Sequence, residues 1–288
     1  MYYVDLLISG VAFGCLYAMA TMGLTLVYGL LRILHIAHAA LFTLGAFVGV
    51  WVFNASGSLI VGLIVAILAA VVMGCLRYRL IYESILSQPP YVPLLASLGV
   101  LIFLQDGFRI VFGEEGLTVR HNPFYMANFT IGAFSINVIY IVMAGGALIS
   151  MAVLAFFANY SRHGIAWRAT VSRPLLAANF GVNVIQVRYA AFAAGSALAA
   201  IAGVLVALMN NLVEPHSGEL ISYKGLAIIV LGGLGNMQGA FIASLVLGIA
   251  ESFGIGLAGR YVDRDAIAAV ALIATLMIFP NGIGRART

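Results

Sequence analysis

Charged residues are scarce in this sequence. Asp, Glu, Lys and Arg make up 8% of its 288 residues, whereas 63% are hydrophobic, and the mean hydropathy is +1.09. A soluble domain carries about 25% charged residues, so this chain has too few charges to cover a surface in water. Its apolar runs are also far longer than the roughly 10-residue alternating strands of a membrane barrel. These absences predict an all-α polytopic membrane protein.

Cysteine and lysine are nearly missing. Cys15 and Cys75 both lie in apolar runs, which favours inert core thiols over a disulfide framework or a metal motif. Lys224 is the only lysine and follows no G-x-x-x-x-G sequence, so the chain has no P-loop for ATP hydrolysis. Sequences of the types G-x-S-x-G and H-E-x-x-H are absent too. We therefore expect no catalytic residue, no metal and no cofactor on this chain.

The apolar runs predict about eight transmembrane segments. They lie near residues 4–31, 39–54, 58–81, 92–113, 136–158, 187–212, 223–250 and 264–280. A helix needs about 20 residues to span a membrane, so the second run is short, whereas the seventh is long and interrupted by glycines. The first run has no basic start and no small-residue cleavage site, which predicts a retained span.

Basic residues predict the orientation of these segments. They gather at the end of the third run, in the loop 159–186 and in the C-terminal tail. They are Arg77 and Arg79, then Arg162, Arg168 and Arg173, then Arg285 and Arg287. The positive-inside rule places all three regions in the cytoplasm and the loop 113–135 outside. The pI near 9.2 therefore reflects membrane orientation, and we expect lipid and no nucleic acid as a partner.

The stretch VLGGLGNMQGAF, residues 230–241, interrupts the seventh run. Between two cytoplasmic ends the chain crosses an even number of times, but three runs follow the loop 159–186; a break within 223–250 restores the parity. We expect a turn between half-helices that lines a solute path, because non-helical backbone at membrane depth survives only where it is shielded or wetted. Close helix packing through small residues is the alternative. The path residues are Gly232, Gly233, Gly235, Gly239, Asn236 and Gln238, with the two amides either satisfying freed backbone or facing the solute.

The two halves of the chain share a weak pattern. Small residues four apart occur in the first span and again in the sixth, at Gly10, Gly14 and Ala18 and at Gly195, Ala199 and Gly203. Each of these spans is followed by an interrupted segment, an arrangement that points to a transport site near the membrane midplane. We expect one transmembrane domain over residues 1–288, with broken or re-entrant helices in pseudo-repeats near 1–115 and 187–282.

Ionisable residues within the apolar runs have more than one interpretation. His35 and His38 are three apart and can share a helix face, but no Cys, Asp or Glu nearby completes a metal site. They either hydrogen-bond across helices or face the solute path. Asp106 and Arg109, spaced i,i+3, are expected to neutralise each other near the membrane surface. Glu251 ends an apolar run and has the same interfacial interpretation.

The loop 159–186 is long, basic and rich in small and apolar residues. Its segment 175–178 precedes Phe180 and Gly181, which predicts a short helix that ends at a glycine cap. An apolar helix on the cytoplasmic side indicates either a docking surface for another protein or a helix that lies on the bilayer.

Several segments together resemble a known family. GLTLVYGLLRILHIAHAALFTLGAFVG (23–49), YSRHGIAWRATVSRPLLAANFGVNV (160–184) and VLGGLGNMQGAFIASLVLGIAESF (230–253) are similar to motifs of LivH-type permeases of branched-chain amino acid ABC importers. LGVLIFLQDGFRIVFG (98–113) and FPNGIGR (279–285) also resemble the corresponding parts of that family. The matches run in order along nearly the whole chain.

The resemblance implies a permease subunit in a bacterial inner membrane, with a small solute such as a branched-chain or other amino acid. It implies four kinds of partner: a second homologous permease, membrane lipid, two cytoplasmic subunits that bind ATP, and a periplasmic substrate-binding protein. The loop would meet the ATPases through Arg162, Arg168, Ala169, Arg173, Ala178, Gly181 and Asn183.

The sequence departs from the family pattern at two places. The usual N-F-A-H-G reads H-I-A-H-A from His35 to Ala39, and no acidic residue follows Arg168 and Ala169. A stand-alone secondary transporter and a passive channel are the alternative functions. The secondary transporter usually has a buried carboxylate for ion coupling, and the expected positions of Asp106 and Glu251 at span ends weigh against it.

Overall fold

The computed structural model describes residues 2–33, 35–122, 124, 127–131, 134–259 and 264–278, and these are mostly helical. The long helices are α1 (Tyr2–Leu31), α2 (His38–Ser56), α3 (Leu59–Arg77), α5 (Tyr91–Phe112), α6 (Val138–Tyr160), α9 (Val184–Asn210) and α11 (Met237–Ala258). The shorter ones are the π-helix η1 (Tyr78–Tyr82), α4 (Glu83–Ile85), α7 (Arg162–Ser172), α8 (Pro174–Asn179), α10 (Ser217–Gly232) and α12 (Arg264–Ile278).

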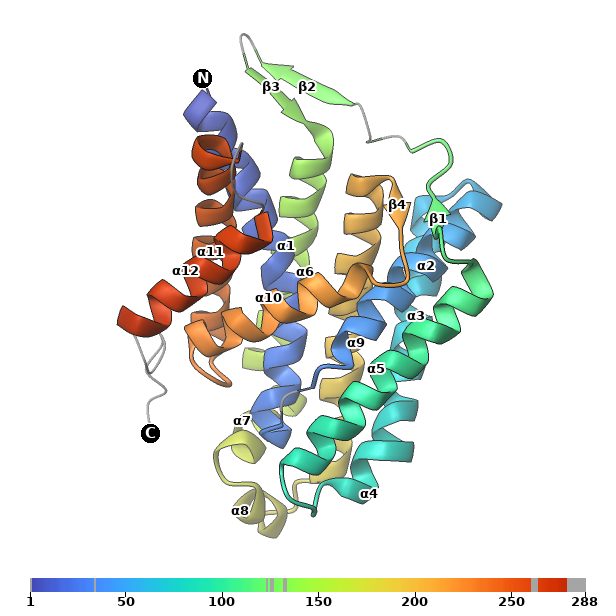
Figure 1. Cartoon of the computed structure of the whole chain (residues 1–288). Coiled ribbons are helices and arrows are strands. Elements are labelled where there is room, and N and C mark those ends of the chain that lie inside the picture. The colour runs from blue at the N-terminus through green and yellow to red at the C-terminus, as the bar shows by residue number, and fades with distance from the viewer. Residues whose placement is uncertain are drawn as a thin grey trace.

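Four short strands lie at the same end of the bundle as the start of α1 (Figure 1). They are β1 (Leu117–Thr118), β2 (Asn128–Ile131), β3 (Phe134–Asn137) and β4 (Leu212–Val213). The pairs β1–β4 and β2–β3 are antiparallel, with Leu117 opposite Val213 and Asn128 opposite Asn137. The helices α4, α7 and α8 lie at the other end. Loop 159–186 and the end of α3 are thus opposite the 113–135 loop, as predicted, whereas Arg285 and Arg287 fall outside the described residues.

Seven helices in the described part of the chain are long and apolar enough to cross a membrane. They correspond to the first six predicted runs and to the second arm of the seventh. The expected number of eight was approximate, because α10 and α12 have 16 and 15 residues, fewer than the roughly 20 that a span needs. The predicted break is confirmed: α10 ends at Gly232, α11 begins at Met237, and α10 crosses the bundle obliquely (Figure 1).

Helix α1 forms the centre of the bundle and packs most extensively on α11. A Cβ at Gly10 or Gly14 would stand 2.8 Å from the Cα of Ile249 or Leu245, and one at Gly248 would overlap the backbone of Gly14. Such close backbone approach is how small residues hold membrane helices together without a hydrophobic driving force. The spacing of small residues in α1 therefore serves the pairing of the first helix with the second arm of the broken segment.

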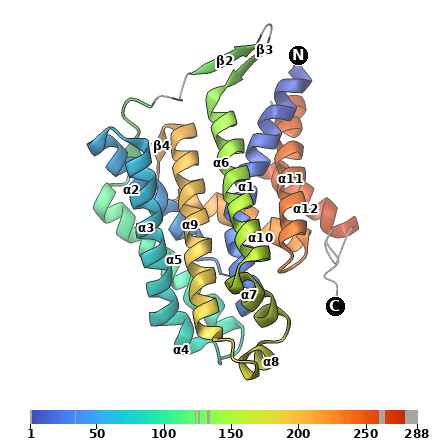
Figure 2. The same ribbon diagram turned by 180° about the vertical axis from the view of Figure 1, so that it is seen from behind.

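Helix α9 makes the equivalent contact with α2, and it lies toward the viewer in Figure 2. A Cβ at Gly45 would overlap Ala200, and one at Gly203 would overlap the carbonyl of Phe42. The two helices with small-residue faces thus pack on α11 and α2, the two helices that follow chain breaks.

Candidate solute path and coupling surface

The beginnings of α2 and α10 meet inside the bundle. Gly218, the second residue of α10, lies so close to the Ala39 carbonyl of α2 that a Cβ would overlap it. The Gly218 backbone N–H donates to Thr43 Oγ1 at 3.1 Å, and Ser222 Oγ donates to the Ile36 carbonyl at 3.4 Å. Two side-chain hydroxyls therefore satisfy backbone groups that the two chain breaks release, as non-helical backbone at membrane depth requires.

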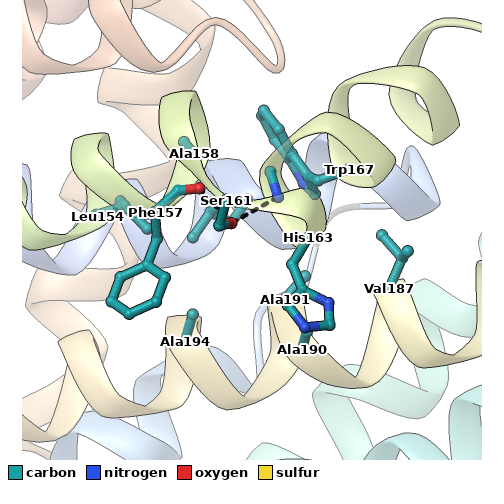
Figure 3. A pocket seen from close by; sticks show the side chains of 12 residues that line it. Leu154, Phe157, Ala158, Ser161, His163, Trp167, Val187, Ala190, Ala191 and Ala194 are labelled. Carbon is teal, nitrogen blue, oxygen red and sulfur yellow. Dashed lines mark hydrogen bonds between the residues drawn. The ribbon is translucent and has the colours of Figure 1, made fainter.

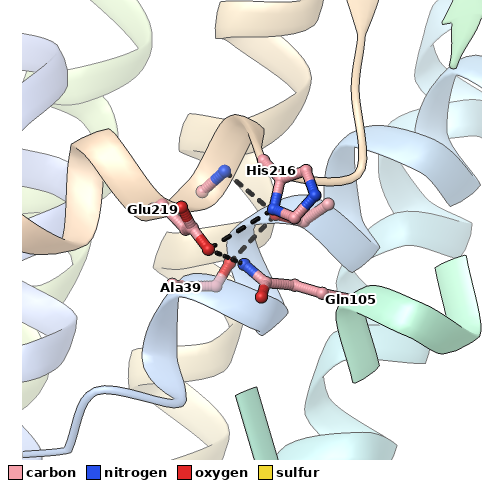
Figure 4. Close-up of polar contacts among 6 residues, drawn as sticks. Ala39, Gln105, His216 and Glu219 are labelled. Carbon is pink, nitrogen blue, oxygen red and sulfur yellow. Dashed lines mark hydrogen bonds and ion pairs between the residues drawn. The ribbon is translucent and has the colours of Figure 1, made fainter. Parts of the chain in front are cut away.

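A polar cluster lies beside this crossing (Figure 4). The Gln105 amide of α5 donates from Nε2 to Glu219 Oε1 at 2.7 Å, and His216 Nδ1 lies 3.4 Å from the same oxygen. Gln105 is buried, whereas the side chains of His216 and Glu219 are 62% and 34% exposed. Neither His216, which precedes α10, nor Glu219 in its first turn was singled out in the sequence, because both come before the apolar run predicted at 223–250.

His35 and His38 both lie inside the protein. His35 is fully buried, with Arg77 Nη2 3.5 Å from its Nε2 and the ring of Tyr82 edge-on at 4.8 Å between ring centroids. Arg77 also donates to the Ala37 carbonyl at 2.7 Å, so it anchors the break between α1 and α2. His38 is 6% exposed. In the isolated chain both rings face neighbouring helices.

The α10–α11 turn is built on its glycines. Gly233 and Gly235 have φ of +90° and +81°, a region that L side chains rarely adopt. Gly232 and Gly239 touch so closely that a Cβ on either would overlap the other side of the turn. The turn packs on the last part of α1, since a Cβ at Gly235 would stand 3.6 Å from Gly29 Cα.

The Asn236 side chain caps α11. Its Oδ1 accepts from the backbone N–H groups of Gln238 and Gly239, both at 3.1 Å, while the Gln238 side chain is exposed. Of the two roles considered for the amides, Asn236 thus satisfies freed backbone.

We expect Asn236→Ala to lower the free energy of unfolding by about 0.5–2 kcal/mol, because it removes this N-cap. Asn236→Ser keeps an acceptor and should lose less. The measurement is thermal unfolding of the purified protein in detergent, with Asn159→Ala in the last turn of α6 as control. A loss at Asn159 as large as at Asn236 would contradict the capping role.

Three buried polar side chains join α1, α10 and α11. Glu251 Oε2 accepts from the Tyr17 hydroxyl at 2.6 Å, Glu251 Oε1 lies 3.1 Å from Lys224 Nζ, and Lys224 Nζ lies 3.3 Å from the Tyr17 hydroxyl. Glu251 is 1% exposed. The interfacial interpretation of Glu251 was therefore wrong, because the long-range pairing with Lys224 compensates its charge inside the bundle.

The expected pairing of Asp106 with Arg109 is also wrong. Arg109 Nη2 instead lies 2.6 Å from Glu114 Oε1, with side chains 51% and 75% exposed. Helix α5 ends at Phe112 and Gly113 has a φ of +87°, so the chain turns back and brings Glu114 to the guanidinium.

The loop 159–186 contains two helices, α7 and α8. The predicted short helix is present as α8, and it ends as expected: Gly181 has a φ of +84° and its N–H donates to the Ala178 carbonyl at 3.0 Å. Leu175 and Phe180 are 82% and 87% exposed. Asn183 caps α9 by accepting from the Gln186 N–H at 3.1 Å, and Arg168 donates to the Ala158 carbonyl. The arginines at 162, 168 and 173 are exposed, as are Ala178 and Gly181, and Ala169 is half-buried.

Helix α7 bears a tryptophan that reaches the bundle. Trp167 borders an apolar cavity of about 240 Å³ among α1, α6, α7 and α9, together with His163 and Val187 (Figure 3). It also packs on the cluster of Met22, Leu26 and Leu198, as do Met237 and Phe241 at the start of α11. The loop is thus in packing contact with the α10–α11 turn through α1.

Known proteins resemble this chain over almost its whole length. Residues 6–280 match the family described as branched-chain amino acid transport system / permease component. The chain belongs to this permease family. It is 30% identical to the high-affinity branched-chain amino acid transport system permease protein LivH of Escherichia coli strain K12, over 98% of this chain and 96% of that protein. It is 28% identical to BraD of Pseudomonas aeruginosa, over 98% and 95% of the two chains. The permease is also 26% identical to a probable LivH of Methanocaldococcus jannaschii, over 96% and 90%.

Proposed function

We propose that this permease is the membrane-spanning subunit of a binding-protein-dependent ABC importer in a bacterial inner membrane. Its solute is a branched-chain or other amino acid or a related small molecule. It pairs with a second homologous permease, and a periplasmic protein delivers the solute. Two cytoplasmic partner subunits bind and hydrolyse ATP, and this chain forms half of the path through which the solute crosses the membrane. Family membership over residues 6–280 supports the class of complex.

The exposed apolar surface at α8 supports the interaction with an ATPase. Leu175 in α8 and Phe180 directly after it are almost fully exposed in the isolated chain. Helix α8 lies at the outermost point of the cytoplasmic end (Figures 1 and 2). A helix that lay on the bilayer would sit beside the bundle at the level of the lipid headgroups. Exposed leucine and phenylalanine flanked by arginines suit a protein partner instead.

The packing also suggests how the loop acts on the path. A Cβ at Gly29 would stand 3.7 Å from both Trp167 and Val171 of α7, and Gly29 in turn borders Gly235. A displacement of α7 can therefore be transmitted to the α10–α11 turn through α1, which contacts both. In this mechanism the motion of the ATPases rocks α10 against α1 and α11, and access to the path alternates.

We also propose that the chain is one domain of two pseudo-repeats, near residues 1–115 and 187–282. The exchange of partners supports this: α1 packs on α11 and α9 packs on α2, so the first helix of each repeat packs on the second half of the broken segment of the other. Such an arrangement is typical of transporters in which one repeat moves against the other around a fixed site.

Co-purification tests the proposed function. The permease, solubilised from native membranes, should retain two ATP-binding subunits and a second permease, and recovery of the chain alone would reject the importer. Phe180→Asp should reduce recovery of the ATP-binding subunits about tenfold or more, since burying an unpaired charge in an interface costs several kcal/mol. Phe129→Asp on β2, also exposed but at the opposite end, should leave recovery unchanged.

A further inference from the structure

Most of the outer surface of the spanning helices is apolar. On α3 and α6 the exposed side chains include Ile60, Ile64, Leu68 and Val72, and Leu148, Ile149, Val153 and Phe156. Aliphatic and aromatic side chains on long helices are what lipid contact favours. These two faces therefore need no protein partner.

One face differs, and we call it the α5–α10 face. It comprises Asp106 and Phe103 on α5, Glu219 and Tyr223 on α10, and His216 just before α10. Asp106 is exposed, the His216 side chain is 62% exposed, and the Glu219 side chain is partly exposed, at 34%. Phe103 and Tyr223 are exposed as well, at 76% and 58%. Ionisable and apolar side chains thus share this part of the surface.

The position of the Glu219 carboxylate along the bundle follows from its neighbours. Gln105, which donates to it, lies about two turns before the end of α5 at Phe112, or about 10 Å at 1.5 Å per residue. Thr43, which accepts from Gly218 beside it, lies about 20 Å before the end of α2 at Ser56. Glu219 therefore lies well inside a hydrocarbon core about 30 Å thick.

A partly exposed carboxylate at this depth does not face lipid, because ionisable groups within a membrane face protein or a water-filled cavity. We propose that the α5–α10 face is the wall of the solute path, facing water and the second permease, and that Glu219 binds the ammonium group of the solute. This inference rests on the proposed function and adds to it the surface, the residue and the charge of the ligand.

The local geometry suits an amino acid with an aliphatic side chain. Gln105 holds Glu219 Oε1 at 2.7 Å, which fixes the carboxylate at the start of α10. Glu219 also favours the helix start through its charge, but that role needs no contact from α5. Leu220 and Tyr223, 52% and 58% exposed, supply apolar surface within one turn, so charged and apolar parts of one solute have partners side by side.

Cysteine accessibility tests whether the face is wet. In the complete importer in membrane vesicles, with Cys15 and Cys75 replaced by alanine, Glu219→Cys should react with a membrane-impermeant methanethiosulfonate reagent, because the thiolate forms only in water. Leu68→Cys on the apolar face of α3 should stay unreactive, and Phe129→Cys on β2 should react. An unreactive Glu219→Cys beside a reactive Phe129→Cys would overturn the proposal.

Transport tests the role of the charge. In proteoliposomes that contain the complete importer, Glu219→Gln should lower uptake of radiolabelled leucine about tenfold or more, the effect of losing one charge-assisted hydrogen bond. Its unfolding free energy should fall by no more than the small contribution of one charge at a helix start, and its bound ATP-binding subunits should match the wild type. Uptake by Glu219→Asp should lie between that of Glu219→Gln and that of the wild type. Unchanged uptake by Glu219→Gln in an assembled importer rejects the ammonium site. Failure of the proposed function is distinguishable from this result, because the wild-type permease would then purify without ATP-binding subunits.

Discussion

Replacing Lys224 by methionine is expected to cost about 3–5 kcal/mol of folding free energy, since it leaves the Glu251 carboxylate in the bundle without its cation. The ammonium lies 3.1 Å from Glu251 Oε1, and the two side chains are only 10% and 1% exposed. Lys224 also joins the short arm α10 to α1 and α11, so the loss should appear as detachment of α10. Reversible unfolding in mixed micelles measures the free energy, and proteolysis within residues 217–232 measures the detachment.

Two variants separate the buried pair from ordinary charge removal. Lys224→Met with Glu251→Met removes both charges and should recover much of the stability, because the penalty belongs to the unpaired charge. Glu114→Gln breaks the ion pair with Arg109, which is also close but exposed, and should cost about 0–1 kcal/mol. If Lys224→Met costs no more than Glu114→Gln, the pair does not tie α10 to the bundle.

Patterns among residues that are close in sequence predicted the positions of the helices and of the chain break. The length of apolar runs gave the positions of the spanning helices, because membrane helices satisfy their backbone within one segment. The glycine cluster and the crossing parity together predicted the break that the structure shows between Gly232 and Met237. Gly181 marked the end of α8 because a left-handed cap is read from one residue type. Each of these features depends on neighbours in sequence.

The candidate site was predicted less completely, because its contacts join distant residues. Tyr17 and Glu251 are separated by 234 residues, and Gln105 and Glu219 by 114. A periodic pattern places a residue on a helix face, but it does not say which other helix meets that face. Glu251 therefore looked interfacial, and Glu219 looked like one more residue at the start of a helix.

The surroundings of the two histidines were also not predictable from sequence spacing. Their spacing predicted a shared helix face, but the break between α1 and α2 places His35 before α2 begins. Its surroundings are then set by Arg77 and Tyr82, from the far end of α3 and the π-helix. Sequence spacing does not predict such a contact across a turn. The role of His35 and His38 in the solute path remains a prediction.

Gly239→Ala is expected to be the most damaging glycine-to-alanine change among the described residues of the permease. The new Cβ would overlap the carbonyl of Gly232, and backbone on both sides leaves no flexible side chain that can yield. Overpacking typically costs about 1–3 kcal/mol, and more where nothing yields, so we expect at least about 3 kcal/mol. Because Gly232 ends α10 and Gly239 lies in the first turn of α11, the two arms can separate only by distorting the turn.

Gly145→Ala on α6 is the matched control for this change. A Cβ there would meet nothing within 4 Å, and alanine is favoured over glycine inside a helix by about 1 kcal/mol, so stability should stay the same or rise. The yield of monodisperse protein on size exclusion and the unfolding midpoint should fall for Gly239→Ala alone. Equal stability of the two variants would mean that the arms are not in backbone contact at the turn, and a push on α7 would then have no rigid joint through which to move α10.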